Sequence, residues 1–320
     1  MSVVINDKEK SLQNRQRQKN ITGMLFLSPW LFGFIVFTLG PMLISLFLAF
    51  TKYDYITEIK WVGLDNFIKM FTNDYHFWNS IVVTFKYVFI REPLKLIFAL
   101  AVALLLNGVV KGSNFYRTMF YLPTVIGGGV AVSVMWKMVL SKEGMLNMVL
   151  GLVNIPPIAW LNDPNITFYS LIMISLYGFG GAMIIFLAGL KDIPASLYEA
   201  AEIDGASKIA KFKNITVPLL SPVIFFNLIM GIINGFQTFT SAFVITGGGP
   251  IGTTSFYMLN LYSQAFEYYK AGYASALAWV LFCIILFFTL IVFKSSNLWV
   301  FYEASAKKSE SKKQKKKGMI

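Results

Sequence analysis

The sequence predicts an all-α, polytopic membrane protein with six transmembrane helices, and three observations support that class. Hydrophobic residues occupy 56% of the 320 positions and charged residues only 14%, a balance too apolar for an ordinary soluble domain. Apolar runs close to the ~20 residues that a bilayer-spanning helix needs recur along the chain. Lysine and arginine gather between these runs and after the last one, as the positive-inside bias of membrane proteins requires.

The first predicted spanning helix covers residues 20–51 and follows a polar N-terminal segment at 1–19. Its uncharged run is far longer than the apolar region of a signal peptide, so we expect a helix that is not cleaved. Five further spans complete a transmembrane domain at 20–295, and the like charges of the basic tail at 296–320 are expected to keep it disordered. The five further spans are expected at 79–107, 118–136, 166–190, 219–246 and 271–293.

The second of these spans carries charged residues. We expect one long helix kinked near Pro93, because proline removes a backbone hydrogen bond inside a helix. Arg91, Glu92 and Lys95 flank this proline, and Glu92 can face Lys95 one turn along. Charged side chains at membrane depth usually face protein or a water-filled cavity. Equally, this end of the helix can project beyond the lipid, and the sequence leaves both interpretations open.

Small and polar residues mark two spans as candidates for lining a pathway. Gly127 and Gly128 lie in the middle of the third span, where glycines indicate close packing or local unwinding. The fifth span is unusually polar for a lipid-exposed helix, and polar side chains in a span tend to face the protein interior or a cavity. Such side chains can hydrogen-bond to carbohydrate. The polar residues of this span are Asn227, Asn234, Gln237, Thr238 and Thr240.

The segment at 193–218 is the one long polar-rich stretch between strongly apolar runs in the C-terminal half. It is predicted to form a helix, a glycine break and a second helix, because Gly205 can adopt a left-handed conformation without strain. Ile209 and Phe212 belong to an apolar stripe on the second helix, which Pro218 is expected to end. From periodicity alone, an amphipathic loop on the membrane surface is an equally good interpretation.

The distribution of basic residues predicts the orientation. Six spans place both termini on one side, where 19 of the 28 lysines and arginines lie. Six lie on the other side and three lie within the second span. This bias predicts that both termini and the segment at 193–218 face the cytoplasm. The net charge of +12 follows from this pattern and from the tail, which argues against a nucleic-acid partner and favours contact with membrane lipid.

The sequence offers little for catalysis or metal binding. One histidine and one cysteine cannot build a Cys/His metal site, and no metal or cofactor is expected on this chain. The sequence contains no GxxxxGK[ST] phosphate-binding loop and no HExxH, GxSxG or CxxC motif. We therefore expect a protein that is not an enzyme. If it uses the energy of ATP hydrolysis, a separate chain must hydrolyse the ATP.

The stretch YEAAEIDGASKIAKFKNITVPLLSP resembles the EAA motif of ABC-importer permeases, with Glu199-Ala200-Ala201, Gly205 and Pro218 in the order of that family. The resemblance covers most of residues 20–295 and is nearest to the carbohydrate-uptake class, of the MalF- or UgpA-like type. Four further segments are similar to the same permeases: FLSPWLFGFIVFTLGPMLISLFLAFTKY, WVGLDNFIKMF, FYRTMFYLPTVI and TGGGPIGTTSFYMLNLYSQAFEYYKAGYASA.

This resemblance implies the fold of a type I ABC-importer permease in a bacterial cytoplasmic membrane. It implies a second homologous permease subunit, two cytoplasmic ABC ATPases that hydrolyse ATP with Mg²⁺, and an extracytoplasmic solute-binding protein. The segment at 193–218 would be the coupling element that docks on an ATPase. The glycine-rich third span, the fourth span and the polar face of the fifth would line the substrate pathway. The coupling residues would be Glu199, Ala200, Ala201, Asp204, Gly205, Ile209, Phe212 and Pro218.

The resemblance implies import of a sugar or oligosaccharide, and two alternatives within transport stand beside it. One is an ABC permease for a non-sugar solute such as glycerol phosphate. The other is a channel or carrier that works without an ATPase, against which the scarcity of intramembrane carboxylates and the lack of an internal inverted repeat count. A membrane scaffold or sensor that uses the lysine-rich tail is a third possibility.

Overall fold

The computed structural model describes residues 2–108, 112–126 and 129–301, and their side chains from residue 17 onward. The described chain is mostly helical and divides into two compact units. One unit comprises the residues up to Ile68 together with Gln264–Trp279. The other comprises Lys69–Ser263 together with the residues from Val280 on. The basic tail from residue 302, which was expected to be disordered, lies outside the described residues.

The first unit is built on one continuous helical run. Helix α1 (Ser2–Phe34) passes through a π-helical turn, η1 (Ile35–Leu39), into α2 (Gly40–Ala49), which confirms a helix over the first predicted span. A two-stranded antiparallel hairpin of β1 (Thr51–Lys52) and β2 (Lys60–Trp61) follows, which the sequence did not predict. The Asn66 side chain donates hydrogen bonds to the carbonyls of Ala49 and Thr51, and so holds the end of α2 to the hairpin.

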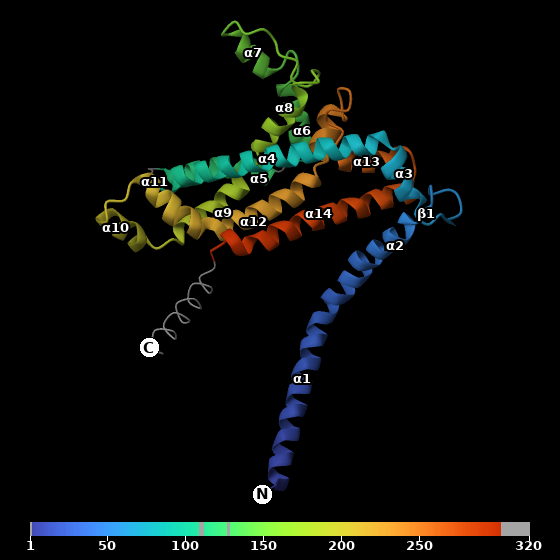
Figure 1. Ribbon diagram of the computed structural model, residues 1–320, viewed down its shortest axis with the longest axis vertical. Helices are drawn as coiled ribbons and strands as arrows, with labels where there is room; N and C mark the ends of the chain where they lie inside the picture. Colours follow the sequence, from blue (N-terminus) through green and yellow to red (C-terminus); the bar gives the residue numbers. More distant parts are fainter. Residues whose placement is uncertain (1, 109–111, 127–128, 302–320) are drawn as a thin grey trace. The chain divides into compact units, whose positions relative to one another are not determined.

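Figure 1 labels the helices of the second unit and those that belong to both units. Helix α3 (Asp65–Asn73) and turn η4 (Ser263–Glu267) lie across the boundary between the units, and so does the last helix, α14 (Ala271–Trp299). The elements inside the second unit are α4 (Tyr75–Asn107), α5 (Ser113–Ile126), α6 (Val130–Val139), α7 (Met145–Gly151), α8 (Thr167–Leu176), α9 (Gly180–Lys191), α10 (Ala195–Ile203), α11 (Lys208–Lys211), η2 (Phe212–Thr216), α12 (Val217–Phe236), η3 (Ala242–Thr246) and α13 (Tyr257–Tyr262).

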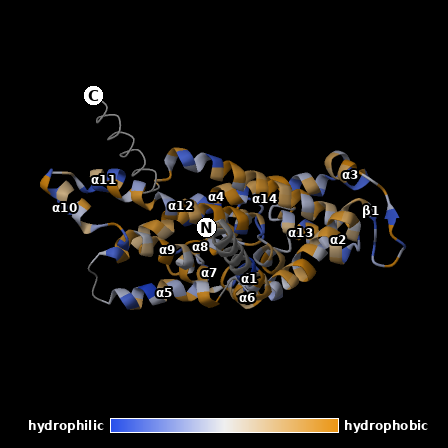
Figure 2. Cartoon of the chain, turned by 90° about the horizontal axis from the view of Figure 1, so that it is seen from below, coloured by the Kyte–Doolittle hydropathy of each residue, from blue (hydrophilic) through white to orange (hydrophobic). Residues whose placement is uncertain are grey.

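Helix α4 is the central element of the second unit and packs against α8, α9, α12 and α13. Its C-terminal half contributes Ala99, Val102 and Ala103 to a core that α9 and α12 complete with Met183, Phe186 and other buried apolar residues. Along α4 the structure confirms the predicted single long helix, and Pro93 lies inside it. Figure 2 shows apolar residues along these helices and hydrophilic ones at the connection between α10 and α11.

Two predicted spans are broken helices. The third divides into α5 and α6, whose axes differ by 109°, and the fourth divides into α8 and α9, bent by 45°. Gly127 and Gly128, where close packing or local unwinding was expected, lie outside the described residues, and Gly129, which precedes α6, has an extended backbone. The second break falls at Tyr177–Phe179 and contains Gly178, a poor helix former.

The predicted fifth span, 219–246, is longer than the helix in the structure. Helix α12 ends at Phe236, and helical structure resumes only just before η3. The side chains of Asn234 and Thr238 bond to the backbone carbonyls of Met230 and Asn234, and such bonds compete with regular helix geometry. Gly247, in a left-handed conformation at φ 59°, ends η3. The stretch between the fifth and sixth predicted spans contains α13 and η4, and the stretch between the third and fourth contains α7.

The prediction that Pro218 ends a helix was wrong. Residues Lys208–Phe236 form a single 29-residue helical run in which Pro218 is near the start of α12. The turn before it, η2, is π-helical, and the Val217 N–H bonds to the carbonyl of Phe212, five residues back. This wider turn relieves the clash between a proline ring and the carbonyl four residues earlier, so the helix continues through the proline.

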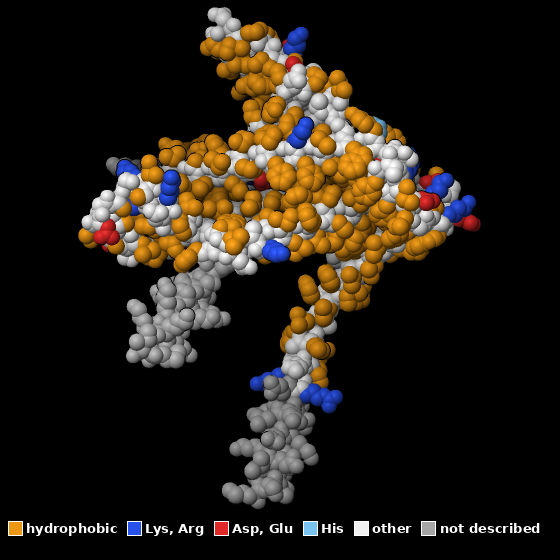
Figure 3. Space-filling model, viewed as in Figure 1, with side chains coloured by type: hydrophobic (Ala, Val, Ile, Leu, Met, Phe, Trp, Pro, Cys, Tyr) orange, Lys and Arg blue, Asp and Glu red, His pale blue; other side chains and the backbone are white. Residues whose placement is uncertain are grey.

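Among the residues that the structure describes, three helical runs are long and apolar enough to cross a membrane: Arg17–Ala49, Lys208–Phe236 and Ala271–Trp299. The number becomes five if each bent pair is one span. The charges of Lys86, Arg91, Glu92 and Lys95 keep α4 out of this count. Figure 3 shows that, on one face, hydrophobic side chains cover most of α4, α12 and α14.

The contact between α5 and α9 yields a prediction with a matched control. A Cβ atom at Gly180 would lie 2.3 Å from the backbone oxygen of Phe120, whereas one at Gly181 would lie 3.4 Å from the Thr124 methyl group. Gly180→Ala should therefore destabilise the protein by about 1–3 kcal/mol through overpacking. Gly181→Ala should be neutral or slightly stabilising, because alanine favours a helix over glycine. Melting temperatures of the two purified variants test this, and equal values would contradict the contact.

Candidate functional site

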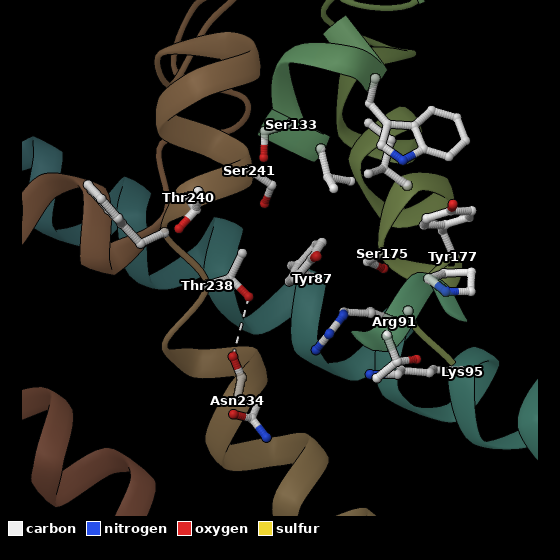
Figure 4. Close-up of a pocket in the computed structure, with 17 residues that line it drawn as sticks. Tyr87, Arg91, Lys95, Ser133, Ser175, Tyr177, Asn234, Thr238, Thr240 and Ser241 are labelled. Carbon is white, nitrogen blue, oxygen red and sulfur yellow. Dashed lines mark hydrogen bonds between the residues drawn. The ribbon is translucent and has the colours of Figure 1, made fainter. Parts of the chain in front are cut away.

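A cavity of about 430 Å³ opens within the second unit, between α4, α5, α6, α8 and the segment that follows α12. Figure 4 shows hydroxyl, amide, aromatic and basic side chains around it. Each break in the predicted spans lies beside this cavity, so the broken helices supply its wall. The lining residues are Tyr87, Arg91, Lys95, Pro123, Thr124, Val132, Ser133, Trp136, Ile174, Ser175, Tyr177, Gly178, Asn234, Thr238, Phe239, Thr240 and Ser241.

Helix α4 contributes Tyr87, Arg91 and Lys95, which lie four residues apart and so share one face of the helix. The Arg91 guanidinium carbon lies 5.6 Å from the centre of the Tyr87 ring, within the range of a cation–π contact. Figure 4 shows Arg91 projecting from α4 toward the turn that carries Asn234 and Thr238. Of the two interpretations of these charges, the structure favours the one in which they face a cavity.

Glu92 points away from the cavity wall and is buried, with 2% of its surface exposed. Its Oε1 forms an ion pair with Arg91, and its Oε2 has no hydrogen-bond partner among the described residues. Helix α12 makes room for this carboxylate with two glycines, since a Cβ at Gly231 would lie 2.1 Å from Oε2 and one at Gly235 would lie 3.3 Å from Oε1. The ion pair with Glu92 therefore fixes the position of the Arg91 guanidinium group, and Arg91 still lines the cavity.

Three of the pathway residues predicted from the sequence line the cavity: Asn234, Thr238 and Thr240. Two others do not. Asn227 is buried elsewhere on α12, where its side chain donates to the Val223 carbonyl at 3.0 Å, and Gln237 is exposed. Gly127 and Gly128 lie outside the described residues.

The resemblance implied that the third and fourth spans line the pathway, and α5, α6 and α8 do contribute to the cavity wall, but the individual residues were not identified from the sequence. Ser133 and Trp136 come from α6, Ser175 from α8, and Tyr177 from the bend after α8. Single serines and aromatic residues within apolar runs carry no pattern of their own. The signal that could have found them is the glycine beside each break, because a bend turns the adjoining helix ends toward the same space.

The segment between α9 and α12 is a second candidate site. Helix α10 ends in a Schellman motif, in which the Ala206 N–H donates to the Ala201 carbonyl at 2.8 Å and the Gly205 N–H donates to the Glu202 carbonyl at 3.0 Å. Gly205 has φ +74°, as the predicted glycine break requires. The Ser207 hydroxyl then accepts from the Ala210 N–H and caps α11.

Two side-chain contacts fix α10, one to the turn that precedes α12 and one to α11. The Tyr198 hydroxyl lies 2.9 Å from the Thr216 hydroxyl, and Lys211 forms an ion pair with Glu202. The hydrogen bond from Lys211 and its charge lower the pKa of the Glu202 carboxyl below its ordinary value. These contacts define the orientation of α10 relative to α11.

The surface of the segment is left open. Glu199, Ala200 and Asp204 are exposed, and Ala201, Phe212 and Pro218 are half-buried. Two isoleucines are largely exposed, Ile203 at 87% and Ile209 at 69%. An acidic residue beside exposed aliphatic side chains on a short rigid turn is suited to contact another protein. Within the described chain, no group of three His, Cys, Asp or Glu residues is arranged to hold a metal ion.

The profile of the family described as the binding-protein-dependent transport system inner membrane component matches residues 21–296. The chain belongs to this family. The resemblance to ABC-importer permeases drawn from its motifs is thereby confirmed, and with it the expectation of an inner-membrane transport component.

Individual relatives agree with this assignment. The chain is 49% identical over 291 residues to a probable ABC transporter permease protein, YesP, of Bacillus subtilis, covering 90% of the chain and 94% of YesP. It is 33% identical over 278 residues to the trehalose/maltose transport system permease protein MalF of Thermococcus litoralis, covering 85% and 92%. The crystal structure of a bacterial ABC transporter involved in the import of alginate has the same fold, with a TM-score of 0.77 at 22% identity over 90% and 98% of the two chains.

A substitution at Gly205 tests the backbone conformation of the turn without a steric clash, because a Cβ there would meet no atom within 4 Å. Gly205→Val should destabilise the turn by about 1–2 kcal/mol, the cost of a left-handed conformation for a residue with a side chain. Gly205→Asn is the matched control, since asparagine tolerates this conformation better. Hydrogen exchange of residues 195–211 should be faster in Gly205→Val than in Gly205→Asn. Equal exchange in both variants would contradict the left-handed turn.

Proposed function

We propose that this chain is the permease subunit of an ATP-driven, binding-protein-dependent importer, and that it forms the translocation pathway for a sugar or oligosaccharide with a second, homologous permease. The observation that carries this proposal is the cavity, whose hydroxyl, amide and aromatic side chains match the polar edges and apolar faces of sugar rings. The names of relatives support the substrate class: MalF is a trehalose/maltose permease and AraP of Bacillus subtilis an arabinooligosaccharide permease.

Six spans and a cytoplasmic location of both termini are part of the proposal. The five candidate spans become six when α4 is added, whose charges are accommodated by the cavity and by the Arg91–Glu92 pair. The excess of basic residues on the terminal side supports the orientation. In this arrangement the segment of α10 and α11 faces the cytoplasm in a bacterial cell membrane, and α7 and α13 belong to loops on the extracytoplasmic side, where a solute-binding protein docks.

Energy reaches this chain through the segment of α10 and α11. Two ABC ATPases bind and hydrolyse ATP with Mg²⁺, and this chain binds no cofactor of its own. Glu199 pairs with a basic residue of an ATPase, and Ile203 and Ile209 bury their exposed side chains in the contact. The remaining coupling residues, from Ala200 to Pro218, shape the segment.

A first experiment tests the function as a whole. The chain is expressed with the permease, ATPase and binding-protein genes of its own genome neighbourhood, and the purified complex is reconstituted in liposomes. We expect uptake of oligosaccharide that needs both ATP and the binding protein. Uptake that needs neither would favour the channel or carrier, and uptake restricted to glycerol phosphate would favour the non-sugar importer.

Glu199→Lys tests the coupling contact. Reversing the charge of an exposed residue should leave the fold unchanged but place like charges together at the interface, which costs several kcal/mol. We expect stimulation of ATPase activity by the loaded binding protein to fall at least tenfold while the subunit is inserted normally. Glu58→Lys, on the loop between β1 and β2, is a control for charge reversal at an exposed site. Normal stimulation in Glu199→Lys would rule out the proposed role.

Asn234→Leu tests the cavity. The substitution keeps the size of the side chain but removes an amide at the cavity wall, so a bound sugar loses a hydrogen-bond partner. We expect the KM for uptake to rise about tenfold, a loss of roughly 1.4 kcal/mol. Thr289→Val on α14 is the control, because that hydroxyl bonds only within its own helix and does not line the cavity. An unchanged KM in Asn234→Leu would remove this residue from the substrate site.

A further inference from the structure

We infer that the substrate of this cavity is an acidic saccharide, one that carries a carboxylate, and that Lys95 and Arg91 recognise that group. The inference rests on the proposed function and makes it more specific, because it names the substrate class that the same cavity accepts. It is carried by the charges of the cavity wall and by the partners of each of the two cations.

The cavity wall carries two positive charges and no negative one. Among its lining residues Arg91 and Lys95 are basic, and none is acidic. The sequence of the surrounding elements extends this contrast, since Glu92 is the only Asp or Glu in residues 75–142, 164–191 and 205–266. A cavity built for a neutral sugar gains nothing from unbalanced cations in an apolar setting, where each one loses hydration.

The two cations differ in their partners. Arg91 is paired with the buried Glu92, which balances its charge and fixes the direction of its guanidinium group. Lys95 is half-buried, and within the part of the chain that the structure describes it has neither an ion pair nor a hydrogen bond. The cluster therefore keeps one net positive charge. One carboxylate balances it, whereas the doubly charged phosphate of a sugar phosphate would leave a negative charge at the site.

Other side chains on the wall are ready to bind the uncharged part of such a ligand. Trp136 and Tyr177 line the cavity, and their rings meet edge to face at 5.4 Å. Aromatic rings of this kind are suited to pack against the apolar face of a sugar ring. Figure 4 shows Ser133, Ser175, Thr240 and Ser241 around the same space.

The test is direct binding to the purified transporter complex, without the binding protein, so that the selectivity of that protein does not enter. The complex is held in phosphatidylcholine nanodiscs, which removes anionic lipid as a competing source of negative charge. Probes are disaccharides of galacturonate, glucuronate and mannuronate, each paired with its methyl ester, and glucose 6-phosphate. The ester keeps the sugar and removes only the charge. Binding is followed by calorimetry at low and high salt.

We expect at least one uronate disaccharide to bind tenfold or more tightly than its ester, and to weaken as salt rises. Lys95→Gln should reduce this preference to less than threefold, and Lys95→Arg should retain it. Lys86→Gln is the matched control, because Lys86 lies on the same helix but outside the cavity lining. Melting temperatures of all variants establish that they are folded.

Three results would overturn the inference: equal binding of acid and ester, no binding of any uronate, or a preference for glucose 6-phosphate over all of them. A preference for the acid that survives Lys95→Gln would also overturn the role of Lys95. The proposed function fails separately. ATP-dependent uptake of a neutral oligosaccharide with no preference for acids supports the importer and contradicts this inference, whereas loss of all ATP-dependent uptake contradicts the importer itself.

Discussion

The charges within helix α4 impose the constraint on which the second unit depends. A helix that lies between α8, α9 and α12 cannot hold Arg91, Glu92 and Lys95 in its middle unless each one finds a partner or water. Glu92 turns toward α12, where two glycines admit its carboxylate, and Arg91 pairs with it. Lys95 reaches the cavity instead. The close approach of α4 to α12 and the open space on the other face of α4 thus have one cause.

The breaks in the helices follow a similar logic. Helices α5 and α6, α8 and α9, and α12 and η3 are each interrupted where they border the cavity. Backbone groups released at such breaks need hydrogen-bond partners, which is tolerated at membrane depth where the backbone lines a polar space. The cavity is therefore a place where side chains and broken helices together provide polar groups, and a continuous bundle would have filled it with apolar side chains.

Sequence reasoning anticipated the long elements because their signals are local. Uncharged runs located α1–α2 and α14, and Gly205 marked the turn after α10. It failed at Pro218 because the π-helical turn that accommodates this proline has no sequence signature. It also extended the fifth span through Gln237, since hydrophobic periodicity does not report where Asn234 and Thr238 bond to the backbone. It assigned the third and fourth spans to the pathway without identifying which residues of α6 and α8 face the cavity, because that depends on two bend angles that composition does not determine.

The helical run from Lys208 to Phe236 has a mechanical consequence. Its 29 residues extend roughly 43 Å at the usual rise of a helix, from the exposed turn beside Gly205 to the turn at Asn234. No loop interrupts this distance, and the Tyr198–Thr216 bond clamps α10 to its first turns. The helical run therefore connects the α10–α11 segment at one end to the cavity wall at the other. Any partner that tilts α10 and α11 displaces Asn234 as well, and the run can bend at the π-helical turn η2 and at Pro222.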